Sequence, residues 1–139
     1  MITYVDTSVV VKLVIDEPGS RQSEAIWDNA DALAASKLGY VAVRAALAAA
    51  NRARRLVGVR HAQAVMAVDA LWDQLSVLEV TDDLVVHAAE LAERHRLRGY
   101  DAVHLGSALL VGAEIMASAD RDLCRAAAEA GLHVANPTG

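Results

Sequence analysis

The sequence predicts an α/β fold of three layers, in which a central parallel sheet of four or five strands lies between helices. The first observation is that short apolar runs rich in β-branched residues alternate along the chain with longer stretches of helical periodicity. The second is that 139 residues, 55% of them hydrophobic, suit one domain with a substantial core. Because parallel strands are joined by right-handed helical crossovers, this order of elements covers both faces of the sheet. Residues 1–139 are therefore expected to form a single domain.

The first half of the chain contains two predicted strands and four predicted helices. Ile2–Val5 is a short β-branched run typical of a buried strand, and Asp6-Thr7-Ser8 then offers capping side chains to a helix through Ile15. The elements that follow are a helix opened by Pro18 and Gly19 and running toward Trp27, a strand over Asp31–Ala35, and helices over Leu38–Arg55 and from Gly58 to Trp72.

The second half repeats the alternation of strands and helices. Thr81, Asp82 and Asp83 form a plain first-turn pattern after a strand at Val77–Val80, so these two acids are expected to be structural. The predicted elements that follow are a helix to about Arg96, a helix over Tyr100–Val111, a strand over Glu114–Ala117, a helix from Asp120 to Ala130 that Gly131 ends, and a strand over Leu132–Ala135.

Composition and charge exclude several classes of protein. The formal net charge is −5, which is the wrong sign for a protein that coats nucleic acid, although a site built from carboxylates contributes negative charge itself. Cys124 is the single cysteine, so no intrachain disulfide can form. No basic leader precedes the first strand and no apolar run could cross a bilayer, which predicts a cytoplasmic protein without a membrane partner. Several arginines form either a solvated helix face or a phosphate-contacting surface: Arg44, Arg52, Arg54, Arg55 and Arg60.

Three acidic residues are the candidate site. Asp6 and Asp120 each lie between a predicted strand and the following helix, and Asp101 begins a helix after Gly99. Each could simply cap its helix or favour the helix dipole. However, Asp6 and Asp120 directly follow strands and should face the same edge of a parallel sheet, which is the edge where such sheets bind ligands. Carboxylates brought together repel one another, and a hard cation such as Mg²⁺ relieves that repulsion.

Three segments resemble the motifs of PIN-domain proteins, and they do so in order across essentially the whole chain. They are Tyr4–Lys12, with Val5-Asp6-Thr7-Ser8 at its centre, Tyr100–Leu105 and Ala117–Leu123. The small single domain is similar to the VapC toxins of bacterial toxin–antitoxin pairs. This resemblance implies a PIN-like fold, an endoribonuclease dependent on Mg²⁺ or Mn²⁺, an RNA substrate, a cognate antitoxin and a homodimer.

One position departs from the family pattern. Ser36–Leu47 resembles the second PIN motif, whose key residue is a glutamate, and Ala42 stands in its place. No other acid lies between Asp31 and Asp69 to replace it. The resemblance therefore implies that this chain is catalytically impaired, whether Ala42 is a natural variation or an introduced substitution.

The chemistry of RNA cleavage suggests a role for each acid. A divalent cation can activate the attacking water and relieve charge at the phosphate, with Asp6 as its central ligand, Asp101 as a second, and Asp120 completing the site or orienting water. His104 lies about one turn from Asp101 but is not expected to be catalytic, because metal-activated water needs no imidazole base, and Asp122 is expected to point away. Three hydroxyl side chains can either bond to these carboxylates or cap helices: Thr7, Ser8 and Ser118.

Three other functions fit the sequence less well. The main alternative is a catalytically inactive PIN-like module that binds a partner protein, for which Ala42 would be the sign of lost catalysis. A phosphoacceptor domain requires an adjacent acidic pair after the first strand and a late lysine, whereas Thr7 follows Asp6 and the only lysines are Lys12 and Lys37. A phosphatase with an Asp-x-Asp nucleophile is excluded by Ser8 in the second acidic place.

Overall fold

The computed structural model describes residues 1–139 and contains one sheet of five parallel strands. The strands are β1 (Ile2–Val5), β2 (Ala32–Ser36), β3 (Ser76–Leu78), β4 (Ile115–Ala117) and β5 (His133–Ala135). Their spatial order is β3-β2-β1-β4-β5, so the first strand of the chain lies in the centre. Tyr4 is aligned with Ala34 on one side and with Met116 on the other. The predicted parallel α/β sheet is confirmed, with five strands.

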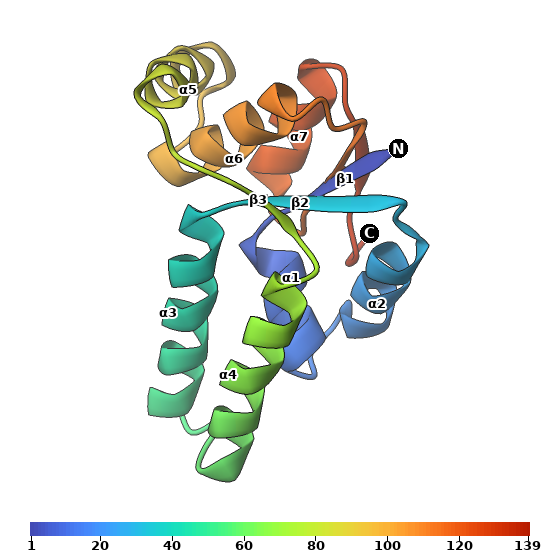
Figure 1. Ribbon diagram of the computed structural model, residues 1–139, viewed down its shortest axis with the longest axis vertical. Coiled ribbons are helices and arrows are strands. Elements are labelled where there is room, and N and C mark those ends of the chain that lie inside the picture. Colours follow the sequence, from blue (N-terminus) through green and yellow to red (C-terminus); the bar gives the residue numbers. More distant parts are fainter.

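Helices cover both faces of the sheet, as Figure 1 shows. One group consists of α1 (Thr7–Val14), α2 (Ser20–Asn29), α3 (Leu38–Arg52) and α4 (Val59–Trp72). The other consists of α5 (Asp82–His95), α6 (Gly99–Leu110) and α7 (Arg121–Glu129). Helices α3 and α4 form a long hairpin that projects away from the sheet (Figure 1). The three layers follow from crossovers that return each strand to the same direction.

The alternation of side chains along the strands divides the core into two parts. Tyr4 and Met116 face the side of α5, α6 and α7, where they join Leu105 in one cluster of buried residues. Val5 and Ala117, one position further along, belong to a second cluster on the side of α1 to α4. Because successive side chains of β1 and β4 point to opposite faces of the sheet, these two strands contribute residues to both clusters.

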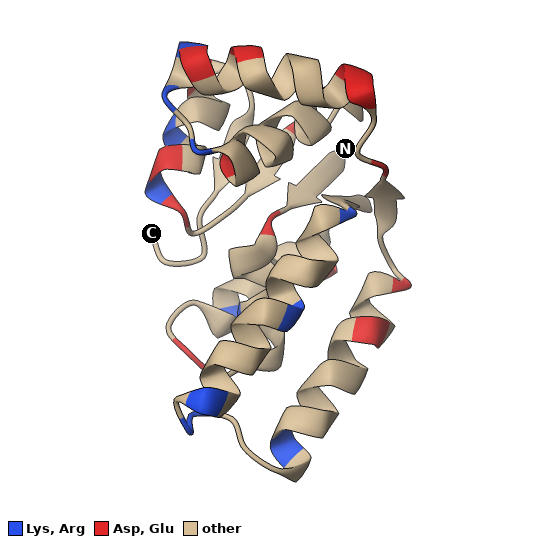
Figure 2. Ribbon diagram, turned by 90° about the vertical axis from the view of Figure 1, so that its left-hand side faces the viewer, with Lys and Arg blue, Asp and Glu red and all other residues tan.

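The predicted elements are all present, and most differences are small shifts at their ends. The helix predicted over Leu38–Arg55 ends at Arg52, because the chain turns at Arg54, whose φ is +59°. Gly131 follows α7 at φ +97°, a conformation that favours glycine, as its predicted role in ending the helix requires. Basic residues gather at the far end of the α3–α4 hairpin (Figure 2), where Arg52, Arg54, Arg55 and Arg60 are exposed, whereas Arg44 is exposed in the middle of α3. No helix combines the length and apolar character that a bilayer span requires.

Candidate active site

A cleft of about 380 Å³ opens beside the carboxyl end of β1. This strand has β2 on one side and β4 on the other, so the cleft lies where the direction of strand addition reverses. Such a switch point is where open parallel sheets bind their ligands. All three candidate acids line this cleft: Asp6, Asp101 and Asp120. The prediction that these residues share one edge of the sheet agrees with this arrangement.

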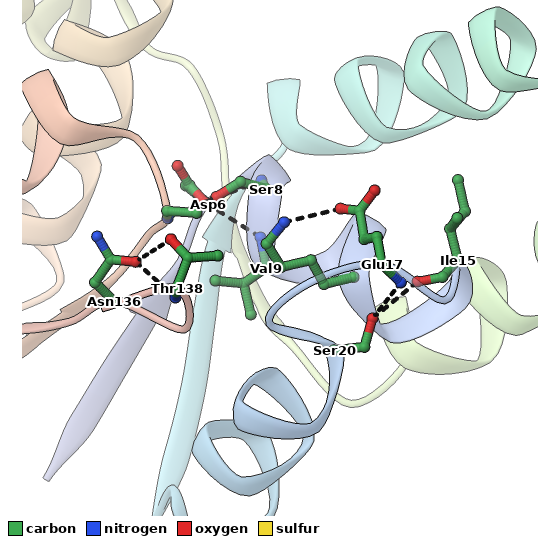
Figure 3. Close-up of polar contacts among 10 residues, drawn as sticks. Asp6, Ser8, Val9, Ile15, Glu17, Ser20, Asn136 and Thr138 are labelled. Atoms are coloured by element: carbon green, nitrogen blue, oxygen red, sulfur yellow. Dashed lines mark hydrogen bonds and ion pairs between the residues drawn. The ribbon is translucent and has the colours of Figure 1, made fainter.

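Asp6 is fixed at the base of the cleft by the turn from β1 into α1. It is the N-cap of α1, and its Oδ1 accepts hydrogen bonds from the backbone N–H groups of Ser8 at 3.0 Å and Val9 at 3.4 Å. The hydroxyl of Ser8 donates a third bond to the same oxygen at 2.5 Å (Figure 3). Only 5% of Asp6 is exposed. The carboxylate therefore has one orientation, set by donors that suit its charged form.

Ser118 joins the end of β4 to the same carboxylate. Its hydroxyl donates to Asp6 Oδ2 at 2.6 Å and accepts a bond from the N–H of Asp120 at 2.9 Å. The Ser8 hydroxyl accepts a bond from the N–H of Ala119 at 2.9 Å. The hydroxyls of Ser8 and Ser118 therefore bond to a carboxylate instead of capping a helix. The helix caps are Asp6 for α1 and Asp120 for α7.

Asp101 and Asp120 both contact the guanidinium of Arg98. Arg98 Nε is 3.4 Å from Asp101 Oδ2, and its NH2 group is 3.5 Å from Asp120 Oδ2. Burial raises the pKa of Asp101, and repulsion from Asp120 raises it further, while Arg98 opposes both effects. Because Arg98 is 79% exposed, it neutralises this pair of carboxylates only partly.

The site has the donor chemistry of a hard divalent cation but no preformed cage. Carboxylate oxygens of Asp6, Asp101 and Asp120 line one cleft, with one exposed guanidinium to balance them. No three side chains of the kinds that ligate metals lie close enough together to hold one ion as they stand. Mg²⁺ usually takes one or two protein carboxylates and keeps several waters, so this donor set fits Mg²⁺ better than a cation that needs a full protein shell.

Helix α3 forms one wall of the cleft with small side chains. Ala42 and Ala46, one turn apart, both line it. Residue 42, where the motif comparison expects a glutamate, therefore faces the three acids. A glutamate at this position would extend its carboxylate into the cleft, whereas the methyl group of alanine leaves that space open.

Sequence reasoning missed Glu17, which also lines the cleft. It lies in the connection between α1 and α2, where its N–H donates to Ser20 Oγ at 3.0 Å (Figure 3). Its carboxylate accepts a hydrogen bond from Lys12 Nζ at 2.9 Å. The sequence gives little sign that Glu17 belongs to the site. Lys12 lies in α1 and Glu17 lies after the end of that helix, so no helical periodicity relates the two residues. Asp122, Asp82 and Asp83 lie outside the cleft, as expected of them.

The sequence is similar to those of known proteins. The model of the PIN domain family matches residues 3–129. Two Mycobacterium tuberculosis proteins, ribonuclease VapC45 and ribonuclease VapC49, are each 43% identical over 136 residues, which cover 96% of this chain and 94% of the relative.

Solved structures have the same fold at lower identity. PAE2754 from Pyrobaculum aerophilum superposes with a TM-score of 0.72 at 21% identity, covering 97% of this chain and 90% of that one. A toxin–antitoxin complex from Klebsiella pneumoniae gives a TM-score of 0.69 at 18% identity, covering 97% of each chain. With the family model spanning nearly all of the sequence and two VapC ribonucleases aligned almost end to end, the chain belongs to the PIN-domain family and is a homologue of the VapC ribonucleases.

Proposed function

We propose that the protein is a metal-dependent endoribonuclease and the toxin component of a toxin–antitoxin pair. The observation that carries this proposal is the single cleft lined by Asp6, Asp101 and Asp120 at the carboxyl end of β1. The relatives at 43% identity are named ribonucleases, which supports RNA as the substrate. The strongly acidic lining opposes direct binding of a phosphodiester, so a cation is needed between the carboxylates and the RNA.

Mg²⁺ or Mn²⁺ would be held by Asp6 and Asp101, with Asp120 as a further ligand or as an acceptor for water. Such a cation, when bound, neutralises charge on the phosphate and lowers the pKa of water. Asp6 presents a carboxylate that Ser8 and Ser118 hold in one orientation. Asp120 is held by the N–H of Leu123, which donates to its Oδ1 at 3.0 Å. The chain therefore supplies two rigid carboxylates and one, Asp101, whose charge is less well stabilised.

Ala42 impairs this site in the chain as it stands. Its methyl group can neither bind a cation nor orient water, so one negative charge is absent from the wall formed by α3. Glu17 does not replace it fully, because its carboxylate is already paired with Lys12. We infer weak binding of Mg²⁺ and slow cleavage of RNA.

The proposed partners are an antitoxin and a second copy of the chain. The Klebsiella pneumoniae complex, which has the same fold, contains a toxin and an antitoxin. An antitoxin segment could inhibit the enzyme by placing a basic side chain among the carboxylates, where it would replace the charge of the cation.

A binding module without catalytic activity is the second candidate, and Ala42 is the observation that favours it. The three remaining acids argue against it, because a module that only holds a partner has no need of repelling carboxylates in one cleft.

Cleavage of total cellular RNA, with and without EDTA, decides between the two. We expect little cleavage by the chain as it stands and chelator-sensitive cleavage by an Ala42→Glu protein, with a gain of about two orders of magnitude, or about 3 kcal/mol of transition-state stabilisation. Ala45→Glu, on the exposed side of α3, is the matched control and should give no gain. Adding Asp6→Ala to the Ala42→Glu protein should abolish the activity. No chelator-sensitive cleavage by Ala42→Glu on any RNA would favour the binding module.

A further inference from the structure

His104 lines the acidic cleft although it is 4% exposed and was not expected to act as a base. Its Nδ1 is 2.7 Å from the hydroxyl oxygen of Tyr4, and the two rings meet edge to face at 69°. Its Nε2 makes no hydrogen bond to the protein and is not among the fully enclosed polar atoms that lack a partner. The ring is thus anchored on its Nδ1 side and open toward the cleft on the other.

The direction of the bond between Tyr4 and His104 follows from a third residue. The backbone N–H of Ser36 donates to the Tyr4 oxygen at 3.0 Å, so one acceptor position of that oxygen is already used. The Tyr4 hydroxyl is completely buried, and the acceptor within hydrogen-bond geometry is His104 Nδ1, because the nearby Ser107 hydroxyl makes no hydrogen bond. A buried hydroxyl that failed to donate would lose a hydrogen bond without compensation from water. Tyr4 therefore donates its proton to Nδ1.

This bond fixes the tautomer of the imidazole. If Nδ1 accepts, a neutral ring must carry its hydrogen on Nε2. Burial lowers the pKa of His104, although the carboxylates of Asp6, Asp101 and Asp120 oppose that effect, and burial likewise raises the pKa of Tyr4. Both shifts favour the neutral partners of this pair. The cleft consequently contains a neutral N–H donor beside the carboxylates of Asp6, Asp101 and Asp120.

We propose that His104 is a substrate-binding residue, which donates its Nε2 hydrogen to a non-bridging oxygen of the RNA phosphodiester, and that Tyr4 is its positioning residue. None of the three acids accepts this hydrogen. A neutral donor can bind a phosphate oxygen beside a divalent cation without repelling the cation, as an imidazolium would. This inference rests on the proposed ribonuclease function and names a contact through which the cleft recognises its substrate.

The first test is the tautomer in the free protein, measured on the full chain by ¹⁵N NMR of labelled histidines. We expect His104 to show a protonated Nε2 and an unprotonated, hydrogen-bonded Nδ1, and Tyr4→Phe to shift the Nδ1 resonance toward that of a free imidazole. A His104 ring protonated on Nδ1 would overturn the proposal, whatever the activity of the protein.

The second test is the binding of a single-stranded RNA oligonucleotide in the presence of Mn²⁺, measured by fluorescence anisotropy on the slowly cleaving chain as it stands. His104→Ala should weaken binding by about tenfold, the effect of losing one hydrogen bond to a charged acceptor. His104→Gln, whose amide N–H₂ reaches near the Nε2 position, should retain most of the affinity, whereas the shorter His104→Asn should not. His87→Ala, on the exposed surface of α5, is the control and should bind normally.

Phosphate contact is distinguished from a structural role by the RNA itself. A methylphosphonate that removes the recognised oxygen should weaken binding to the unaltered protein but have no further effect on His104→Ala. The affinity for Mn²⁺ alone should be equal in the two proteins, because His104 is not proposed as a ligand. Full RNA affinity in His104→Ala, with cleavage by Ala42→Glu intact, would overturn this inference and leave the ribonuclease proposal standing. If the Ala42→Glu protein neither binds nor cleaves RNA, both this inference and the ribonuclease proposal are overturned.

Discussion

Ser118 Oγ donates a hydrogen bond of 2.6 Å to Asp6 Oδ2, although the two residues are 112 positions apart. The bond connects the ends of β4 and β1, which are paired with Val5 opposite Ala117. The same hydroxyl accepts from the N–H of Asp120, so one side chain positions two of the three acids.

Removing this hydroxyl should destabilise the protein. Ser118→Ala leaves Asp6 without one donor and the N–H of Asp120 without its acceptor, and we expect the free energy of unfolding to fall by about 1–3 kcal/mol. Urea denaturation monitored by circular dichroism measures the change. Ser23→Ala is the matched control, because Ser23 is equally buried and its hydroxyl has no partner. An equal loss in the two variants would show that the hydroxyl of Ser118 contributes nothing beyond packing.

A glutamate at residue 42 should make stability depend on divalent cations. Without metal, Ala42→Glu adds a like charge to the cleft and should lower the melting temperature. Mg²⁺ at about 100 times its Kd should restore about 2.7 kcal/mol. Ala46→Glu, also in the cleft but one turn along α3, tests whether position matters. A Mg²⁺-dependent rise in melting temperature that is the same for both variants would contradict a specific role for residue 42.

Arg98 should compete with a cation for Asp101 and Asp120. Arg98→Gln removes the positive charge shared by these carboxylates, so the affinity for Mn²⁺ should rise by about two- to fivefold, the equivalent of an exposed ion pair of up to about 1 kcal/mol. Isothermal titration calorimetry measures this, and exposed Arg94 supplies the control variant Arg94→Gln. Weaker Mn²⁺ binding by Arg98→Gln would mean that Arg98 orders the site rather than competing for it.

The raised pKa of Asp101 predicts a pH-dependent cost to stability. Folded protein holds this proton more tightly than unfolded protein does, so the free energy of unfolding falls as pH rises from the ordinary aspartate pKa through the raised one. Asp101→Asn removes this cost, and it should be more stable than the unaltered chain at pH 7 without metal.

The advantage of Asp101→Asn should vanish at pH values below the ordinary aspartate pKa, where the carboxyl is protonated in both states. Urea denaturation across this range, with the exposed Asp122→Asn as control, checks the sign. A stabilisation by Asp101→Asn that is independent of pH would trace the effect to packing instead of charge.

The sequence by itself determined the order of the elements and the placement of two of the three acids. β-branched runs, helical periodicity and capping residues are local signals, read within one or two turns, so Ile2–Val5 could be predicted as a strand and Asp6 as the residue that leads into a helix. Once strands are parallel, their carboxyl ends share an edge, and Asp6 and Asp120 follow from that rule alone.

The tertiary structure decided which groups those acids contact. The bonds of Ser118 to Asp6 and of Tyr4 to His104 join residues 112 and 100 positions apart. Glu17 reaches the cleft from a connection without regular structure, where no sequence period applies. Such contacts depend on strand order, on the crossover that brings α6 against β2, and on side-chain rotamers. These are properties of the packed chain, because the free energy that selects them comes from burying distant segments together.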